Sequence, residues 1–151
     1  MRALVVYDTK FGNTERVARA IGERLRGAGE VTVAAVSERP QLPDGLNLLV
    51  VGSPQAFRMS PPMREWVDAT AWWARQRVAT FDTRLGRSRW LTGSAARSLA
   101  RRLRRCGCQL VGEPQSFIVA GSEGPLREGE LDRAARWADS LVAPFAAVPA
   151  R

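Results

Sequence analysis

Short apolar runs alternate with segments of helical periodicity along the whole chain. Apolar residues spaced near 3.6 positions predict helices over residues 14–28, 62–73, 92–107 and 128–142. Continuous or alternating apolar runs predict strands at Ala3–Tyr7, Glu30–Ala35, Asn47–Gly52 and Arg77–Phe81. A fifth strand is expected in two parts, 109–111 and 115–119, interrupted at Gly112-Glu113-Pro114.

This alternation predicts a single doubly wound α/β domain with a five-stranded parallel sheet and helices on both faces. The run Leu48-Leu49-Val50-Val51 is typical of a parallel strand that is buried on both faces. We expect the domain to cover residues 1–143. Residues 144–151, with Pro144 and Pro149, are expected to form a C-terminal tail.

In such a fold, ligands bind beyond the carboxyl ends of the strands. Three loops are predicted there: residues 8–14, 53–62 and 82–93. The first follows a strand, contains Thr9, Gly12 and Thr14, and runs directly into a helix. Backbone N–H groups at a helix N-terminus attract anions, so this loop is a candidate phosphate site.

The charge is unusual. The 151 residues carry 23 Lys and Arg against 15 Asp and Glu, a net charge of +8, and Lys10 is the one lysine. Arg97, Arg101 and Arg105 share one helical face, which is typical of a solvated surface. A docking patch for an acidic protein partner is the alternative, whereas DNA is not expected because no aromatic residues interleave the arginines.

Other function classes are limited by what the chain lacks. No apolar run reaches the roughly 18–20 residues of a membrane span, so we expect a cytoplasmic protein without a membrane span. Without histidine, a His-dependent nucleophilic site is excluded, and we predict neither catalytic side chains nor a metal site. Cys106 and Cys108 are expected to be buried or half-buried free thiols. A cofactor is therefore expected to supply any redox chemistry.

The loop sequences separate the candidate phosphate-binding families. The chain has neither G-x-G-x-x-G after its first strand nor G-x-x-x-x-G-K-[ST], which argues against dinucleotide-binding and P-loop domains. The third predicted strand ends Val51-Gly52-Ser53, without the aspartate that a receiver domain needs. The first loop has no cysteine, as a low-molecular-weight tyrosine phosphatase would require.

Two motifs resemble those of the flavodoxin-like family, in particular its short-chain flavodoxins. Val6-Tyr7-Asp8-Thr9-Lys10-Phe11-Gly12-Asn13-Thr14 resembles that family's FMN-phosphate signature, and Gly52-Ser53-Pro54-Gln55-Ala56-Phe57 resembles its second flavin loop. The resemblance implies that FMN phosphate is wrapped by Thr9, Lys10, Phe11, Gly12, Asn13 and Thr14. It further implies that Phe57 stacks on the flavin ring, with Pro54, Gln55, Ala56 and Arg58 along the ring edge.

The third loop matches the family pattern least. By the resemblance, Asp82 and Thr83 meet the ring edge through their backbone, Arg84 lies near the site, and Trp90 stacks on the outer ring face or anchors the following helix. The loop contains no tyrosine, and Phe11 replaces a hydroxyl residue of the first loop.

The function implied by the resemblance is FMN-binding electron transfer, with monomer and dimer both open. An FMN-dependent quinone or porphyrinogen-type oxidoreductase on the same fold is one alternative. A cofactor-free binding or regulatory module is the other. Positive charge from Lys10, Arg58, Arg84, Arg87 and Arg89 predicts a less negative potential than that of typical, acidic flavodoxins.

Overall fold

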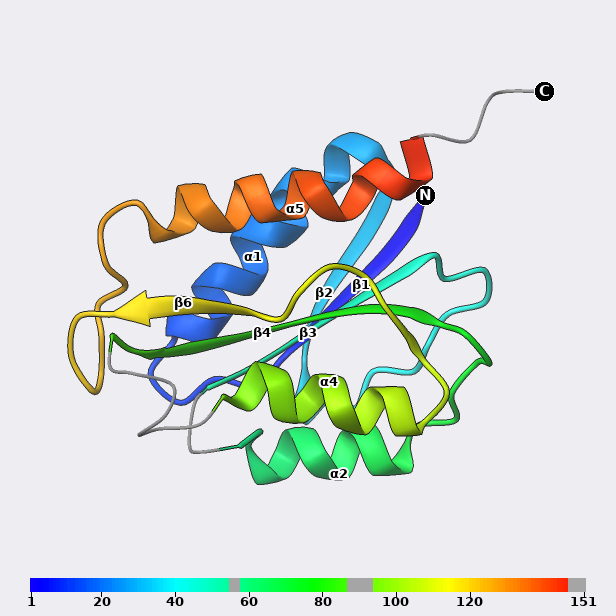
Figure 1. Ribbon diagram of the computed structural model, residues 1–151, viewed down its shortest axis with the longest axis horizontal. Helices are drawn as coiled ribbons and strands as arrows, with labels where there is room; N and C mark the ends of the chain where they lie inside the picture. Colours follow the sequence, from blue (N-terminus) through cyan, green and yellow to red (C-terminus); the bar gives the residue numbers. More distant parts are fainter. Residues whose placement is uncertain (55–57, 87–93, 147–151) are drawn as a thin grey trace.

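The computed structural model describes residues 1–54, 58–86 and 94–146 (Figure 1). The strands are β1 (Arg2–Tyr7), β2 (Glu30–Ala35), β3 (Leu48–Pro54), β4 (Arg77–Leu85), β5 (Gln109–Leu110) and β6 (Gln115–Val119). The helices are α1 (Asn13–Leu25), α2 (Pro61–Ala69), α4 (Ala95–Arg105) and α5 (Glu130–Ala146), with short 3₁₀ turns η1 (Arg26–Ala28) and η2 (Val36–Glu38). Among these residues no helix is long and apolar enough to cross a membrane.

The strands form one parallel sheet in the order β2-β1-β3-β4, followed by β5 and β6, which both pair with β4. The predicted interruption of the fifth strand is therefore confirmed. β5 lies beside the start of β4 and β6 beside its end, opposite Phe81–Leu85. The carboxyl ends of β1, β3, β4 and β6 consequently lie at one edge of the sheet.

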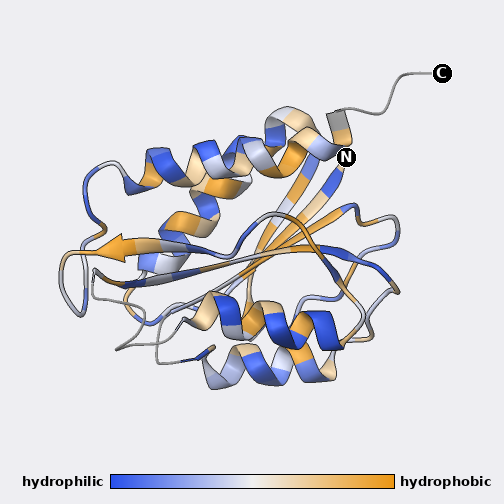
Figure 2. Ribbon diagram, in the orientation of Figure 1, coloured by the Kyte–Doolittle hydropathy of each residue, from blue (hydrophilic) through white to orange (hydrophobic). Residues whose placement is uncertain are grey.

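Helices cover both faces of the sheet, as the doubly wound prediction requires. Figure 1 shows α1 and α5 on one face and α2 and α4 on the other. Alternate residues of β1 separate accordingly: Val5 packs under α1 and α5, while Leu4 and Val6 pack under α2 and α4. Figure 2 shows the hydrophobic residues gathered along the strands and on the inner sides of the helices. Burial on both faces explains the continuous apolar sequence of β3.

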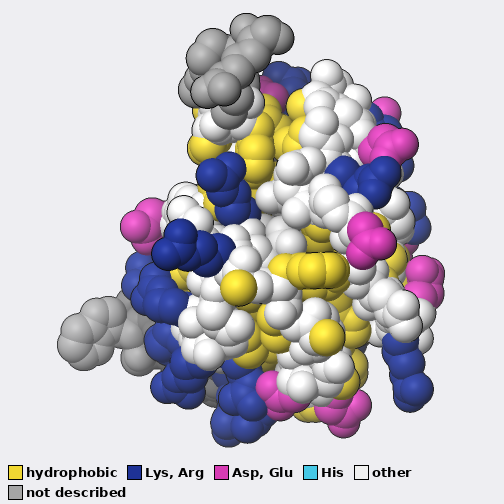
Figure 3. All heavy atoms as spheres, turned by 90° about the vertical axis from the view of Figure 1, so that its right-hand side faces the viewer, with side chains coloured by type: hydrophobic (Ala, Val, Ile, Leu, Met, Phe, Trp, Pro, Cys, Tyr) yellow, Lys and Arg dark blue, Asp and Glu magenta, His cyan; other side chains and the backbone are white. Residues whose placement is uncertain are grey.

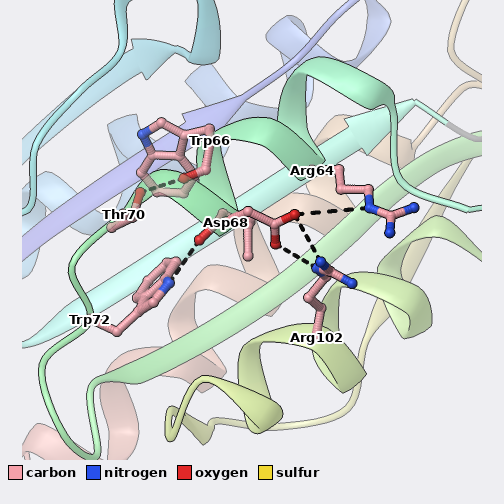
Figure 4. A network of polar contacts seen from close by, with 7 residues as sticks. Arg64, Trp66, Asp68, Thr70, Trp72 and Arg102 are labelled. Carbon is pink, nitrogen blue, oxygen red and sulfur yellow. Dashed lines mark hydrogen bonds and ion pairs between the residues drawn. The ribbon is translucent and has the colours of Figure 1, made fainter.

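The boundaries of β4, α2 and α5 differ from the sequence-based prediction in ways that have a structural cause. β4 continues through the polar residues Asp82, Thr83 and Arg84 because it pairs with β3 on one side and β6 on the other. α2 ends at Ala69 rather than near Trp73, and the Trp72 indole N–H donates to the Val67 carbonyl at 2.9 Å (Figure 4). α5 runs beyond the predicted domain limit at 143, through Pro144, to Ala146.

Both cysteines are free thiols near the helix-to-strand junction, as predicted. Cys106 caps the C-terminus of α4 and is half-buried, and Cys108, just before β5, is buried. Burial raises the pKa of the Cys108 thiol to about 12. This thiol is therefore protonated and unreactive at neutral pH.

Candidate functional site

The loop between β1 and α1 is shaped by its own side chains. Gly12 is the residue before α1 and has φ 88°, a left-handed conformation that glycine adopts without strain. Its N–H donates to Oγ1 of Thr9 at 2.9 Å, which curls the loop over the start of the helix. No heavy atom lies within 4 Å of the position a Cβ would take on Gly12, so its backbone conformation, rather than crowding, favours glycine there.

The first turn of α1 presents backbone donors to this loop. In any α-helix the first N–H groups lack intrahelical acceptors; in α1 the first helical acceptor, the Gly12 carbonyl, binds the N–H of Arg16. The neighbouring side chains are engaged elsewhere: Asn13 Nδ2 donates to the Glu123 carbonyl at 3.1 Å. The Thr14 and Thr83 hydroxyls share a buried hydrogen bond of 2.7 Å. An anion at this turn would therefore be held mainly by backbone N–H groups and the helix dipole.

The loop after β3 is closed at its base. The Ser60 N–H donates to Ser53 Oγ at 2.9 Å, which holds the two ends of residues 53–60 together. Ser60 precedes α2 and is 8% exposed, and its hydroxyl has no hydrogen-bond partner among the described residues. Pro61 and Pro62, the first two helical residues, carry no N–H. The Ser60 hydroxyl is therefore a buried polar group without a described partner, at the N-terminus of α2.

The end of β4 supplies the third part of the site. Asp82 is fully buried, and its carboxylate accepts from Ser94 Oγ and from the Ala96 N–H, each at 3.0 Å. Its side chain thus anchors the N-terminus of α4. The next two residues, Thr83 and Arg84, are 6% and 3% exposed.

These segments enclose a cavity of about 820 Å³ at the carboxyl edge of the sheet. This volume lies within the range of small-molecule sites, roughly 300–1,000 Å³. Its apolar wall consists of Phe11, Pro54, Pro61, Pro62, Leu85 and Val119. Its polar lining consists of Asp8, Thr9, Lys10, Asn13, Thr14, Ser60, Thr83, Arg84, Ser122 and Glu123. An anion-binding turn therefore opens into a largely apolar chamber.

Most of the predicted site residues that the structure describes meet at this cavity. It is lined by Thr9, Lys10, Phe11, Asn13, Thr14, Pro54, Thr83 and Arg84. Gly12 shapes the loop without lining it, Asp82 is turned toward α4, and Arg58 lines a neighbouring cleft. The remaining candidates, Gln55, Ala56, Phe57 and Trp90, lie outside the described residues, as do Arg87 and Arg89.

The loop after β6 also contributes to the cavity, although no site residue was predicted in it. Val119, Ser122 and Glu123 line the cavity, and Asn13 binds the Glu123 carbonyl. The topology rule used for the other loops also applies to this one, since β6 ends at the same edge of the sheet. Ser60 was within a predicted loop, but nothing in the sequence marks its hydroxyl as unpartnered.

The charge of the cavity is more balanced than the sequence suggested. Among its described lining residues, Lys10 and Arg84 are cationic, while Asp8 and Glu123 are anionic. The Lys10 ammonium lies 5.3 Å from the centre of the exposed Phe11 ring. Arg84 is therefore the buried cation of the cavity among the described residues.

Comparison with solved structures identifies the fold. The chain superposes on oxidised flavodoxin 1 of Bacillus cereus with a TM-score of 0.79 and 16% identity, over 94% of this chain and 97% of the other. A flavodoxin from the domain Archaea superposes with a TM-score of 0.77 and 19% identity, over 97% of this chain and 99% of the other. A flavodoxin variant from Fusobacterium nucleatum, bound to flavin mononucleotide, superposes with a TM-score of 0.65 and 15% identity, over 90% of this chain and 92% of the other. No protein-family model and no curated protein sequence matches the chain. The likeness establishes a flavodoxin-like fold, and the predicted fold class is confirmed.

Proposed function

We propose that this chain is an FMN-binding electron-transfer protein that works in the cytoplasm with a protein redox partner. The observation that carries the proposal is the junction of two features in one cavity. The first turn of α1 presents backbone N–H groups to it, and an apolar wall that includes Pro54, Leu85 and Val119 extends from that turn. A ligand with a phosphate joined to a planar, largely apolar ring would use both features, the N–H groups for its phosphate and the apolar wall for its ring.

The residues present fit FMN chemically. The loop Thr9–Thr14 would hold the phosphate through backbone N–H groups, with Lys10 adding positive charge. The unpartnered Ser60 hydroxyl would gain a hydrogen bond from a bound polar group. Phe57 and Trp90 remain proposed ring-stacking residues. When bound, the flavin supplies one- and two-electron transfer.

The chain's own residues would set the conditions for that chemistry. The prolines and aliphatic residues of the cavity would exclude water from the bound ring, which strengthens electrostatic interactions inside the cavity. We propose a potential less negative than that of typical, acidic flavodoxins, because the chain carries a net charge of +8.

The first test is a fluorescence titration of the purified apoprotein with FMN and, separately, with riboflavin. Binding of FMN at least tenfold tighter than riboflavin would support a phosphate site on α1. Equal affinities would contradict it, and failure to bind either flavin would favour the cofactor-free alternative. Turnover of a reduced nicotinamide with a quinone would instead favour the oxidoreductase.

A matched pair of variants sharpens this test. Thr9→Val removes the hydroxyl that accepts the Gly12 N–H, so the loop loses one hydrogen bond of about 1–2 kcal/mol and FMN affinity should fall about 5- to 30-fold. Riboflavin affinity should remain unchanged. Thr32→Val, on the exposed side of β2 and outside the cavity lining, should alter neither affinity.

A further inference from the structure

A basic cleft on the outer side of α2 and α4 is a second candidate binding site. A cavity of about 290 Å³ lies between these helices, and its lining consists of Arg58, Met59, Arg64, Ser98, Arg101, Arg102 and Arg105. Five of these seven residues are arginines. Figure 3 shows basic side chains gathered along the lower left margin of the molecule, at the level where α2 and α4 lie in Figure 1.

The described residues neutralise this cleft only in part. Asp68 of α2 accepts two hydrogen bonds from Arg102, at 2.7 and 2.8 Å, and lies 4.0 Å from Arg64 (Figure 4). Arg58, Arg101 and Arg105 have no ion pair among the described residues. The cleft therefore keeps an excess of positive charge.

Helix stability does not account for this excess. Arginines in the last turn, such as Arg105, interact favourably with the helix dipole. Arg97 and Arg101 lie earlier in α4, and like charges four residues apart repel one another. The spacing of Arg97, Arg101 and Arg105 therefore costs stability in the isolated protein, and an external anion would remove that cost.

We propose that this cleft docks an acidic segment of the redox partner, an inference that rests on the proposed electron-transfer function. The Arg102–Asp68 pair shows how a guanidinium on this face binds a carboxylate through two parallel hydrogen bonds. The stripe from Arg97 to Arg105 spans eight residues, about 12 Å of helix, so it matches several carboxylates rather than a single anion.

The position of the cleft agrees with this role. Met59 lines the basic cleft and Ser60, the next residue, lines the large cavity. A partner bound to the arginines would therefore lie beside the proposed flavin site. A nucleic acid fits less well, since no aromatic side chain is among the lining residues for bases to stack on.

The test measures binding of a fluorescein-labelled deca-glutamate peptide by anisotropy in 50 mM salt. Arg101→Gln/Arg105→Gln should weaken binding at least tenfold. The control Arg75→Gln/Arg136→Gln removes the same charge at exposed positions outside the cleft and should weaken it less than threefold. Raising the salt to 300 mM should weaken binding by the wild type at least tenfold.

Equal losses in the two double variants would overturn the proposal, since net charge alone would then explain binding. Tighter, Arg101- and Arg105-dependent binding of a ten-nucleotide single-stranded DNA would also overturn it, in favour of a nucleic-acid site. FMN titration of Arg101→Gln/Arg105→Gln keeps the two proposals distinct. Unchanged FMN affinity of this variant together with lost peptide binding would support docking at the cleft. Absent FMN binding in the wild type would refute the electron-transfer premise, and the peptide result would then concern the cleft alone.

Discussion

Replacing Gly52 by alanine should destabilise the protein by overpacking the core beside the proposed flavin site. Gly52 lies in the buried part of β3, and a Cβ at this position would overlap the ring of Phe81. To restore ordinary contact distances of about 3.5–4.0 Å, the ring would have to retreat by more than about 1 Å. Phe81 is fully buried and packs edge-on against Phe117 and Trp137, with ring centres 5.9 and 6.1 Å away.

The expected cost follows from this lack of space. Overpacking a closed core typically costs about 1–3 kcal/mol. Since three aromatic rings would have to move together, we expect about 2–3 kcal/mol for Gly52→Ala. In a chain of this length that corresponds to a melting temperature lower by about 4–12 °C.

The assay is urea and thermal unfolding of the apoprotein, followed by circular dichroism. Gly27→Ala is the matched control because a Cβ there meets nothing within 4 Å, and it should change stability by less than about 1 kcal/mol. Phe81→Leu should partly relieve the overlap, so Gly52→Ala/Phe81→Leu should be more stable than the two single changes added together. Equal stability of Gly52→Ala and Gly27→Ala, or strict additivity in the double variant, would refute the reasoning.

Three further predictions concern side chains that are buried or half-buried. Asp82→Ala should cost about 2–4 kcal/mol in urea unfolding, because Ser94 and the Ala96 N–H lose a charged acceptor; exposed Asp132→Ala should cost less than about 1 kcal/mol. At pH 8 a thiol reagent should modify at most Cys106 in the folded protein and both cysteines in urea, because burial raises the pKa of Cys108 to about 12. Rapid modification of both thiols before unfolding would contradict this. Burial acts to raise the pKa of Glu130, but hydrogen bonds from Arg133 and the Ile118 N–H leave this pKa below its usual value. The ionised carboxylate therefore contributes stability above about pH 4.5, and this contribution is lost as the pH falls through the lowered pKa. The stability gap between the wild type and Glu130→Gln should therefore be largest near pH 7 and close in acid, and a gap independent of pH would show that this charge contributes nothing.

The sequence predicts the fold well because its signals are local and repeated. Strands such as β2 and helices such as α1 are marked by periodicity, and the interruption of the fifth strand is marked by Gly112 and Pro114. The end of β4 is different. Asp82-Thr83-Arg84 reads as a loop because its polar side chains find partners or burial only after β6 and α4 have packed against it.

The site is predictable to a similar degree. The loop Thr9–Thr14 carries its own signature, and the structure places it at the cavity. The roles of individual side chains depend on distant partners that no local pattern shows. Asn13 binds the Glu123 carbonyl and Thr14 binds Thr83, so these two side chains, which line the cavity, also hold the surrounding loops together.

The central claim is that the cavity holds FMN with its phosphate at the first turn of α1. The most direct measurement is a ¹H–¹⁵N correlation spectrum of the labelled apoprotein, recorded during titration with FMN. FMN should cause large shifts in the amide signals of Lys10, Asn13 and Thr14 and smaller shifts at Ser60. No shifts are expected around the cavity at the opposite end of the sheet, which Trp73 and Arg75 line. Shifts confined to that opposite cavity, or no shifts at saturating FMN, would contradict this claim.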